Sequence, residues 1–248
     1  LNIVIVGGGA TGIEVAGILS EMKKFVLPND YPDMSSSLMH IYLIEAGPRL
    51  LAGMSEESSA HAEQFLREMG VNILLNKRVV DYRDHKVVLE DGTEIATRTF
   101  IWVSGVTGVT IGNLDASLIG RGGRIKVDSF NRVEGMNNVF AIGDQCIQLA
   151  DENYPNGHPQ LAQVAIQQGE LLAKNLIRME KGQEMKPFHY RNLGSMATVG
   201  RNRAVAEFSK VKMQGWFAWV MWLVVHLRSI LGVRNKVIVL LNWVWNYF

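Results

Sequence analysis

Cysteine is nearly absent from this sequence, since Cys146 is the single one among 248 residues. One cysteine excludes an internal disulfide framework and any zinc or iron–sulfur site built from several cysteines, and it is typical of a reducing compartment. No pair of the six histidines has the spacing of metal ligands, and no Ser/His/Asp set stands out. We therefore predict no metal site and interpret Cys146 and the histidines as structural.

Acidic residues are missing from the end of the chain. Residues 208–248 contain no Asp or Glu but five basic residues and five of the six tryptophans, whereas residues 1–207 carry 20 basic against 24 acidic residues. The two parts nearly cancel, to a net charge of +1. Because no whole-chain basicity is present, we predict that nucleic acid is not a partner.

Long apolar runs are also lacking in this end segment. Its two apolar stretches, residues 216–231 and 237–248, are shorter than the roughly 20 uninterrupted apolar residues of a membrane-spanning helix. Tryptophan with Lys and Arg beside a helical apolar stripe is typical of an interfacial membrane anchor. A dimer interface is the second interpretation of this surface, and a tight transmembrane hairpin is the third.

The start of the chain lacks the features of a signal peptide. The apolar run of residues 1–6 has no basic segment before it and no cleavage site after it. Because the chain begins with Leu1 and not with Met, we expect further residues upstream.

With 48% hydrophobic and 20% charged residues the chain is not disordered, and its length suits one large domain or two small ones.

A glycine motif follows the first strand-like run. Residues 2–6 are β-branched, Gly7-x-Gly9-x-x-Gly12 follows at once, and a helical repeat of apolar residues comes next. In this context Gly7 permits a tight turn, Gly9 lets the backbone approach a pyrophosphate, and Gly12 lets helix and strand touch. The free N–H groups of the helix N-terminus favour an anion. The motif therefore predicts a dinucleotide site.

Two carboxylates accompany the motif. Glu45 ends the next predicted strand, residues 40–44, where it is placed to accept hydrogen bonds from a ribose 2′-hydroxyl and to repel a 2′-phosphate. NAD is thus preferred over NADP, although Arg49 is a residue type that accepts such a phosphate. Glu14 has two interpretations that spacing alone does not separate: a partner of the helix dipole, or a group that reaches the nicotinamide.

Two later segments carry polar residues at suggestive positions. Residues 138–142 are predicted to be a strand that ends in Gly143-Asp144, and the carboxyl end of a central strand is where α/β sheets bind ligands. Gln163 and Gln167 lie one turn apart on a predicted helix, residues 161–179, beside the small residue Ala162. Two neutral amides suit a carbonyl-bearing ligand, and a solvated face is the alternative.

Other elements follow from period and turn signals. We predict a loop at residues 28–33 and a helix at residues 55–69 with Ser55 as its N-cap. We further predict strands at residues 71–75, 79–82, 86–89, 100–103 and 124–127, and a hairpin from residues 195–199 and 204–207.

Taken together, these motifs resemble the type II NADH dehydrogenases over essentially all 248 residues. The similarity is carried by Thr11-Gly12-Ile13-Glu14, by the runs at 43–51, 101–106, 141–144 and 162–169, and by the aromatic tail. It implies an α/β fold with a Rossmann-like NADH-binding domain at residues 1–107, the later part of an FAD-binding domain at 108–190, and a C-terminal hairpin with amphipathic membrane-anchor helices at 191–248. One glycine-rich unit occurs here, so the N-terminal FAD-binding part of the family is missing.

The resemblance also implies roles for residues. Catalytic residues are Glu14, near the nicotinamide, and Gln163 and Gln167, beside the flavin at the quinone pocket. Residues that bind NADH or FAD are Gly7, Gly9, Gly12, Glu45, Gly105, Gly143, Asp144, Ala162 and Gln163.

The activity implied is transfer of a hydride from NADH to FAD and then of two electrons to a membrane quinone, without proton pumping. The partners are the quinone, a membrane surface through residues 211–248, and a second copy of the chain. The expected location is the cytoplasmic face of the inner membrane, as a peripheral protein. Rival hypotheses are an NAD-binding, membrane-associated module without flavin and a related flavin disulfide reductase, which needs a cysteine pair.

Overall fold

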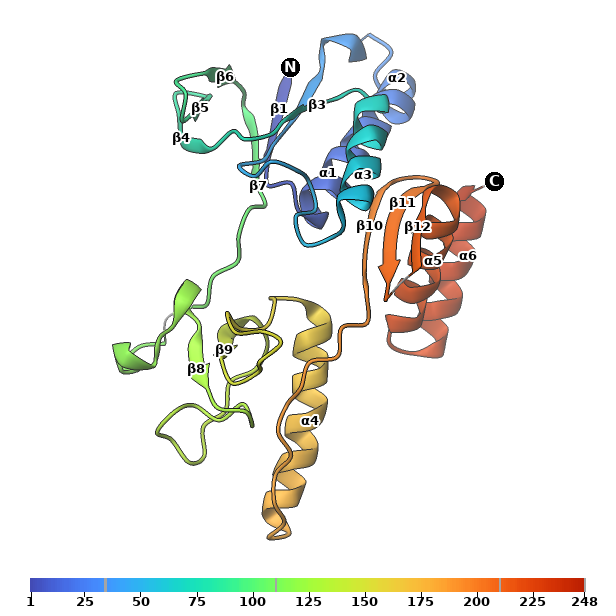
Figure 1. Ribbon diagram of the computed structural model, residues 1–248. Helices are drawn as coiled ribbons and strands as arrows, with labels where there is room; N and C mark the ends of the chain where they lie inside the picture. Colours follow the sequence, from blue (N-terminus) through green and yellow to red (C-terminus); the bar gives the residue numbers. More distant parts are fainter. Residues whose placement is uncertain (34, 110, 210, 248) are drawn as a thin grey trace. The chain divides into compact units, whose positions relative to one another are not determined.

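The computed structural model describes residues 1–33, 35–109, 111–209 and 211–247. The last residue of the predicted anchor, Phe248, therefore lies outside the described residues. The chain divides into two compact units, the first made of residues 1–104 and 194–248 and the second of residues 105–193 (Figure 1).

A parallel four-stranded sheet lies at the centre of the first unit. Its strands are in the order β3-β2-β1-β7, and every neighbouring pair is parallel. Helix α1 connects β1 to β2, and helix α3 connects β2 to β3, which is the Rossmann-like half expected from the glycine motif. The elements are β1 (Asn2–Val6), α1 (Ala10–Glu21), β2 (His40–Ile44), α3 (Glu56–Glu68), β3 (Val71–Leu74) and β7 (Thr99–Trp102).

The two faces of this sheet are covered by different layers. Ile3 and Ile5 point to the face shared with α1 and α3, whereas Val4 and Val6 contact the opposite layer, as the alternation of strand side chains requires. The opposite layer is the antiparallel meander of β4 (Val79–Arg83), β5 (Lys86–Leu89) and β6 (Glu94–Ala96). Burial on both faces explains why β1 is apolar from Ile3 to Val6.

A second antiparallel sheet packs against α1. It consists of β10 (Ser195–Gly200), β11 (Arg203–Phe208) and β12 (Val211–Gln214), so the predicted hairpin is confirmed and has a third strand. A Cβ on Gly17 of α1 would lie 1.6 Å from the carbonyl oxygen of Val199, so only glycine permits this approach. Ala197, Val199 and Val205 share one core with the parallel sheet.

The two C-terminal helices complete the first unit. Helix α5 (Gly215–Ser229) contacts β11 through the buried Ala218, and helix α6 (Val233–Tyr247) contacts α5. Both helices were predicted from the apolar stripes. Within the described part of the chain, no helix combines the length and the apolarity needed to cross a membrane.

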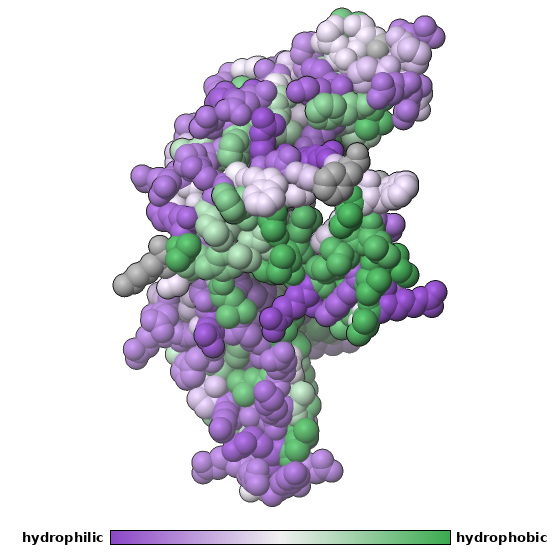
Figure 2. Space-filling view, turned by 90° about the vertical axis from the view of Figure 1, so that its right-hand side faces the viewer, coloured by the Kyte–Doolittle hydropathy of each residue, from purple (hydrophilic) through white to green (hydrophobic). Residues whose placement is uncertain are grey.

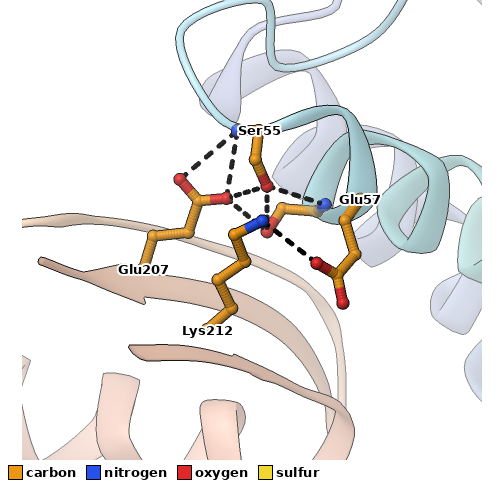
Figure 3. A network of polar contacts seen from close by, with 5 residues as sticks. Ser55, Glu57, Glu207 and Lys212 are labelled. Carbon is orange, nitrogen blue, oxygen red and sulfur yellow. Dashed lines mark hydrogen bonds and ion pairs between the residues drawn. The ribbon is translucent and has the colours of Figure 1, made fainter. Parts of the chain in front are cut away.

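A polar network joins α3 to the second sheet (Figure 3). Ser55 caps α3 as predicted, with its Oγ 3.3 Å from the Ser58 backbone N. Glu207 of β11 accepts hydrogen bonds from the Ser58 hydroxyl at 2.6 Å, from the Ser55 backbone N at 3.0 Å and from the Ser55 hydroxyl. Lys212 pairs with Glu57 at 3.0 Å. The N-terminus of α3 is thus capped by a residue from a distant part of the chain.

The second unit has little regular structure apart from one long helix. Two small cores hold it together, one around β8 and β9 and one around Val164, Phe188 and Tyr190. Its elements are η3 (Ala116–Leu118), η4 (Arg121–Gly123), β8 (Ile125–Val127), η5 (Gly143–Gln145), β9 (Cys146–Gln148) and α4 (Ala162–Glu180), with β8 and β9 parallel.

Two expected elements are wrong. Residues 138–142 form no strand: they make one isolated bridge at Phe140, and Val139 remains 48% exposed. Asp144 therefore precedes the short strand β9 and does not end a central strand. The first half of the expected loop at 28–33 is helical, in α2 (Leu27–Asp30), which follows η1 (Met22–Val26), whereas residues 31–33 are not helical and η2 (Ser36–Leu38) comes after them. Pro28 lies in the first turn of α2, where its missing N–H costs no hydrogen bond.

Candidate functional site

The three glycines of the first turn have different surroundings. Gly7 has φ +117°, and a Cβ there would lie 3.0 Å from the backbone of Ser104. A Cβ on Gly12 would lie 1.8 Å from the carbonyl oxygen of Gly7, so helix and turn touch as expected. A Cβ on Gly9 would have no atom within 4 Å. Gly7 and Gly12 thus shape the turn, and Gly9 leaves space open beside it.

The N-terminus of α1 opens into that space. Gly9 is the N-cap residue and makes no side-chain capping hydrogen bond. The first backbone N–H groups of a helix have no partner within the helix, and the helix dipole adds positive potential there. Because β1 lies between β2 and β7, this turn is also at the point where the strand order reverses, which is where open α/β sheets bind ligands. The arrangement can hold an anionic group such as a pyrophosphate.

Glu45 lies directly beside the glycine turn. Its two carboxylate oxygens accept hydrogen bonds from the Gly8 backbone N at 2.6 Å and from the Gly47 backbone N at 2.7 Å. Each oxygen keeps a further lone pair, so the carboxylate can still accept from a hydroxyl. Arg49 is turned away to its own loop, since its guanidinium donates to the carbonyls of Met54 at 2.7 Å and Ala52 at 2.8 Å.

Glu14 is the fifth residue of α1 and is half-buried against the second sheet. Burial raises the pKa of Glu14 above its ordinary value, although a hydrogen bond from the Thr198 backbone and the nearby His226 act in the opposite direction. Thr198 belongs to β10 and His226 to α5. Glu14 lies beyond the first turn of α1, which weakens its interpretation as a partner of the helix dipole, and its role near the nicotinamide stays a prediction.

Gln163 and Gln167 face the same segment of chain. Gln167 makes two hydrogen bonds with the backbone of Arg191, at 2.9 and 3.1 Å, and Gln163 accepts one from the Leu193 backbone N at 3.0 Å. The i, i+4 spacing puts both amides on one face of α4, as predicted. The surface that they form is occupied by residues 191–193, a role that the sequence alone did not suggest.

Gln168, next to this pair, was missed. Its side chain is fully buried, accepts a hydrogen bond from the Gly143 backbone N at 2.7 Å, and contacts the Cys146 thiol. Gly143 has φ +66°, and Asp144 after it is exposed. The signal was available, because position 168 is on the same helix face as the buried Val164. Burial raises the pKa of the Cys146 thiol, which disfavours the reactive thiolate.

The predicted site residues fall into two groups, one in each compact unit. Gly105 has φ +82° and open space around it, and Ala162 is exposed at the start of α4. No group of three or more metal-ligating side chains occurs among residues 1–33, 35–109, 111–209 and 211–247. The first unit holds Gly7, Gly9, Gly12, Glu14 and Glu45, and the second holds Gly105, Gly143, Asp144, Ala162, Gln163 and Gln167.

The α5 and α6 helices form an apolar surface on the first unit. Figure 2 shows hydrophobic side chains gathered over these helices, with hydrophilic residues at their borders. Phe217 is 73% exposed, Leu241 62% and Trp245 84%. So many large apolar side chains in one patch are typical of a surface that contacts a partner or a lipid phase.

A family model for the pyridine nucleotide-disulphide oxidoreductases matches residues 1–169. The chain belongs to this family. A second model, the NDH2 C-terminal domain, matches residues 192–248. This second match and the curated relatives confirm that the chain resembles the type II NADH dehydrogenases.

Two curated relatives cover nearly the whole chain. The type II NADH:quinone oxidoreductase NdhA of Mycobacterium tuberculosis is 35% identical over 256 residues, which cover 98% of this chain and 53% of that protein. The mitochondrial internal alternative NAD(P)H-ubiquinone oxidoreductase A1 of Arabidopsis thaliana is 32% identical over 265 residues. This match covers 100% of the present chain and 51% of that protein. The chain thus spans about half the length of these relatives.

The same fold occurs in a solved structure. The structure of NDH2 from Plasmodium falciparum in complex with NADH has a TM-score of 0.83 and 20% identity, and the match covers 95% of this chain and 63% of that one. The likeness confirms the Rossmann-like α/β fold of this family member.

Proposed function

We propose that this chain is the NADH-binding and membrane-docking part of an NADH:quinone oxidoreductase that does not pump protons. The observation that carries the proposal is the open space at Gly9, which lies at an uncapped helix N-terminus with the Glu45 carboxylate beside it. The names of the curated relatives, which are NADH:quinone and NAD(P)H-ubiquinone oxidoreductases, support the assignment.

The residues of the first unit fit a dinucleotide. The pyrophosphate would lie against the N-terminal N–H groups of α1, above Gly9, where no side chain intrudes. Glu45 would accept the adenosine ribose hydroxyl, and it would repel the 2′-phosphate of NADPH. Arg49 is engaged with its own loop and so does not offset that repulsion. The nicotinamide would extend toward Glu14.

The second unit offers groups for a flavin. Asp144 and Ala162 are exposed, and a Cβ on Gly105 would meet open space, so none of the three positions is blocked to a large ligand. Bound FAD would supply hydride acceptance and electron transfer. We assign FAD binding to the complete protein, in which Asp144 would hold the ribityl-pyrophosphate region and Gln163 and Gln167 would keep their chain segment beside the ring.

We further propose that α5 and α6 dock on the membrane surface and bring the protein to its quinone. Support comes from the exposed apolar side chains, from the excess of basic residues, and from the absence of acidic residues over 211–248. We also propose a peripheral position on the cytoplasmic face of the inner membrane. Pairing of two copies through the same surface is the alternative.

Steady-state kinetics on the complete protein in membranes test this function. We expect NADH oxidation coupled to reduction of a quinone, and bound flavin visible by its absorbance. Oxidation of NADH with oxygen or dyes but never with a quinone would exclude the quinone assignment. A colourless protein that binds NADH would favour the rival hypothesis of a module without flavin. A disulfide reductase is disfavoured because it needs a cysteine pair, whereas Cys146 is a buried free cysteine and the curated relatives are named quinone oxidoreductases.

A further inference from the structure

We propose that the groove between α5 and α6 is a specific site for one acyl chain of an anionic phospholipid, whose phosphate is held by Arg228 and Lys236. The inference rests on the proposed membrane docking and goes beyond it, because it assigns a saturable lipid site to named residues. A surface that only adsorbs to a bilayer needs no such groove.

The groove runs along both helices. Its larger part has a volume of about 460 Å³ and is lined by Trp219, Val220 and Leu223 from α5 and by Trp243 and Val244 from α6, among others. This volume falls in the range of about 300–1,000 Å³ found for sites of small ligands. It is therefore large enough for one chain.

A smaller part continues the groove toward the turn between the helices. It has a volume of about 240 Å³ and shares Val224, Leu227 and Leu240 with the larger part. The residues that it adds are Arg228, Lys236 and Val237. An apolar channel therefore ends at two cations.

The cations at the two ends differ in what they already bind. Arg201, at the far end, donates to the Tyr247 carbonyl and lies 4.5 Å over the Tyr247 ring. Arg228 and Lys236 form no ion pair within the described part of the chain. Residues 211–248 include no acidic residue that could balance them. The free positive charge at this end is complementary to a phosphate, which Arg and Lys bind well.

The side chains that line the groove favour an acyl chain over a peptide segment. Away from its two ends the lining is formed by aliphatic and aromatic side chains, so a peptide segment would leave its backbone N–H and carbonyl groups without partners. An acyl chain has no such groups. Helix α5 has 15 residues and is about 22 Å long, so an extended chain can lie along it.

Native mass spectrometry of the chain with monomeric lysophosphatidylglycerol, without vesicles, tests the site. This lipid has one acyl chain and one anionic phosphate. We expect one lipid bound per chain at saturation. Arg228→Gln/Lys236→Gln should weaken binding about twenty-fivefold, because each Lys or Arg near an anionic lipid is worth about a fivefold change in affinity.

Two matched controls separate the groove from general effects. Val224→Phe fills a position that both parts of the groove share and should abolish binding, whereas Val225→Phe, which is outside the lining, should leave it unchanged. Lys174→Gln/Lys181→Gln removes the same charge from the other compact unit and should also have no effect. Circular dichroism of each variant checks that the fold is retained.

Several results would overturn the site. One is binding of many lipids without saturation, and another is equal lipid binding by the Val224→Phe and Val225→Phe variants. The third is a neutral quinone analogue that binds more tightly than the lipid and whose affinity does not change when Arg228 and Lys236 are replaced. Flotation with phosphatidylcholine–phosphatidylglycerol vesicles tests the proposed function separately. Vesicle binding without a saturable lipid would overturn the groove alone, and one bound lipid without vesicle binding would overturn the docking function while supporting the groove.

Discussion

Gly9 and Gly12 lie three residues apart but give opposite expectations for alanine. Gly12→Ala should destabilise the chain by about 3 kcal/mol or more, because the new methyl group would overlap the Gly7 carbonyl in a well-packed region. Gly9→Ala should leave the free energy of unfolding nearly unchanged, since its Cβ meets open space, and should weaken NADH binding at least tenfold by entering the ligand position. Urea unfolding and calorimetric titration with NADH measure the two effects.

Gly112→Ala is the matched control for this pair, because it also adds a methyl group in open space but lies far from the motif in sequence and in the other unit. It should change neither stability nor NADH affinity. Normal NADH affinity in Gly9→Ala would contradict the placement of the pyrophosphate above that residue.

The raised pKa of Glu14 predicts that the free energy of unfolding depends on pH. Because its pKa is raised in the folded chain, the unfolded chain releases the proton more readily, and the ionised carboxyl disfavours folding at neutral pH. Glu14→Gln keeps an oxygen for the Thr198 N–H and should unfold at a higher temperature than the parent chain at pH 7. The gain should shrink as the pH falls through the raised folded-state pKa and vanish below the unfolded-state pKa. A gain that grew in acid would contradict the burial of this carboxyl.

At the scale of elements, the contact between α3 and β11 depends on Glu207. Although burial alone would raise the pKa of Glu207, hydrogen bonds from Ser55 and Ser58 outweigh it and hold the pKa below its ordinary value. Glu207→Gln should cost about 1–2 kcal/mol of stability at pH 7, as the loss of a helix cap does. Glu134→Gln, an exposed acid, is the control.

The pH dependence of this cap has the opposite sign to that of Glu14. A carboxyl whose folded pKa is depressed stabilises the fold above its unfolded pKa, and that stability is lost as the pH falls through the folded pKa. The difference between the parent chain and Glu207→Gln in thermal unfolding should therefore narrow in acid. A constant difference across this range would show that the ionised carboxylate does not matter.

Most of the helices and strands could be predicted from local sequence patterns. The β-branched run of residues 3–6, the Ser55 cap and the helical stripe of α5 are each readable from a few neighbouring residues, and the structure confirms these elements. Residues 139–142 are also a continuous apolar run, but among the described residues they pair through a single isolated bridge, at Phe140. Sequence reports what a segment favours locally, and pairing depends on residues far along the chain.

The same limit applies to the candidate site. Gly7, Gly12 and Glu45 were predictable because a short motif sets their surroundings. Glu207 was not, because its partner Ser55 lies 152 positions away in sequence. The contact of Gln167 with Arg191 likewise depends on which segment returns across α4, and a helix face alone does not specify its partner.

At the scale of the whole molecule, charge and tryptophan are unevenly distributed. Residues 1–207 have more acidic than basic residues, whereas residues 208–248 have basic residues and tryptophan but no acidic residue. Replacing the exposed Phe217, Leu241 and Trp245 by Gln should lower binding to anionic vesicles by about tenfold or more, because each large apolar side chain contributes when it leaves water. Gln at Leu38, Val80 and Val139, which are also exposed but lie elsewhere, is the control. Vesicle flotation measures both sets, and equal losses would contradict docking through α5 and α6.

The central claim is that the first unit binds NADH and rejects NADPH. Calorimetric titration of the chain with each dinucleotide tests it most directly, with Glu45→Gln beside the parent chain. We expect saturable NADH binding and NADPH binding at least about tenfold weaker, since the half-buried Glu45 carboxylate repels the added phosphate. Glu45→Gln should narrow that difference. Equal affinity for both dinucleotides, or binding of neither by a folded chain, would contradict the claim.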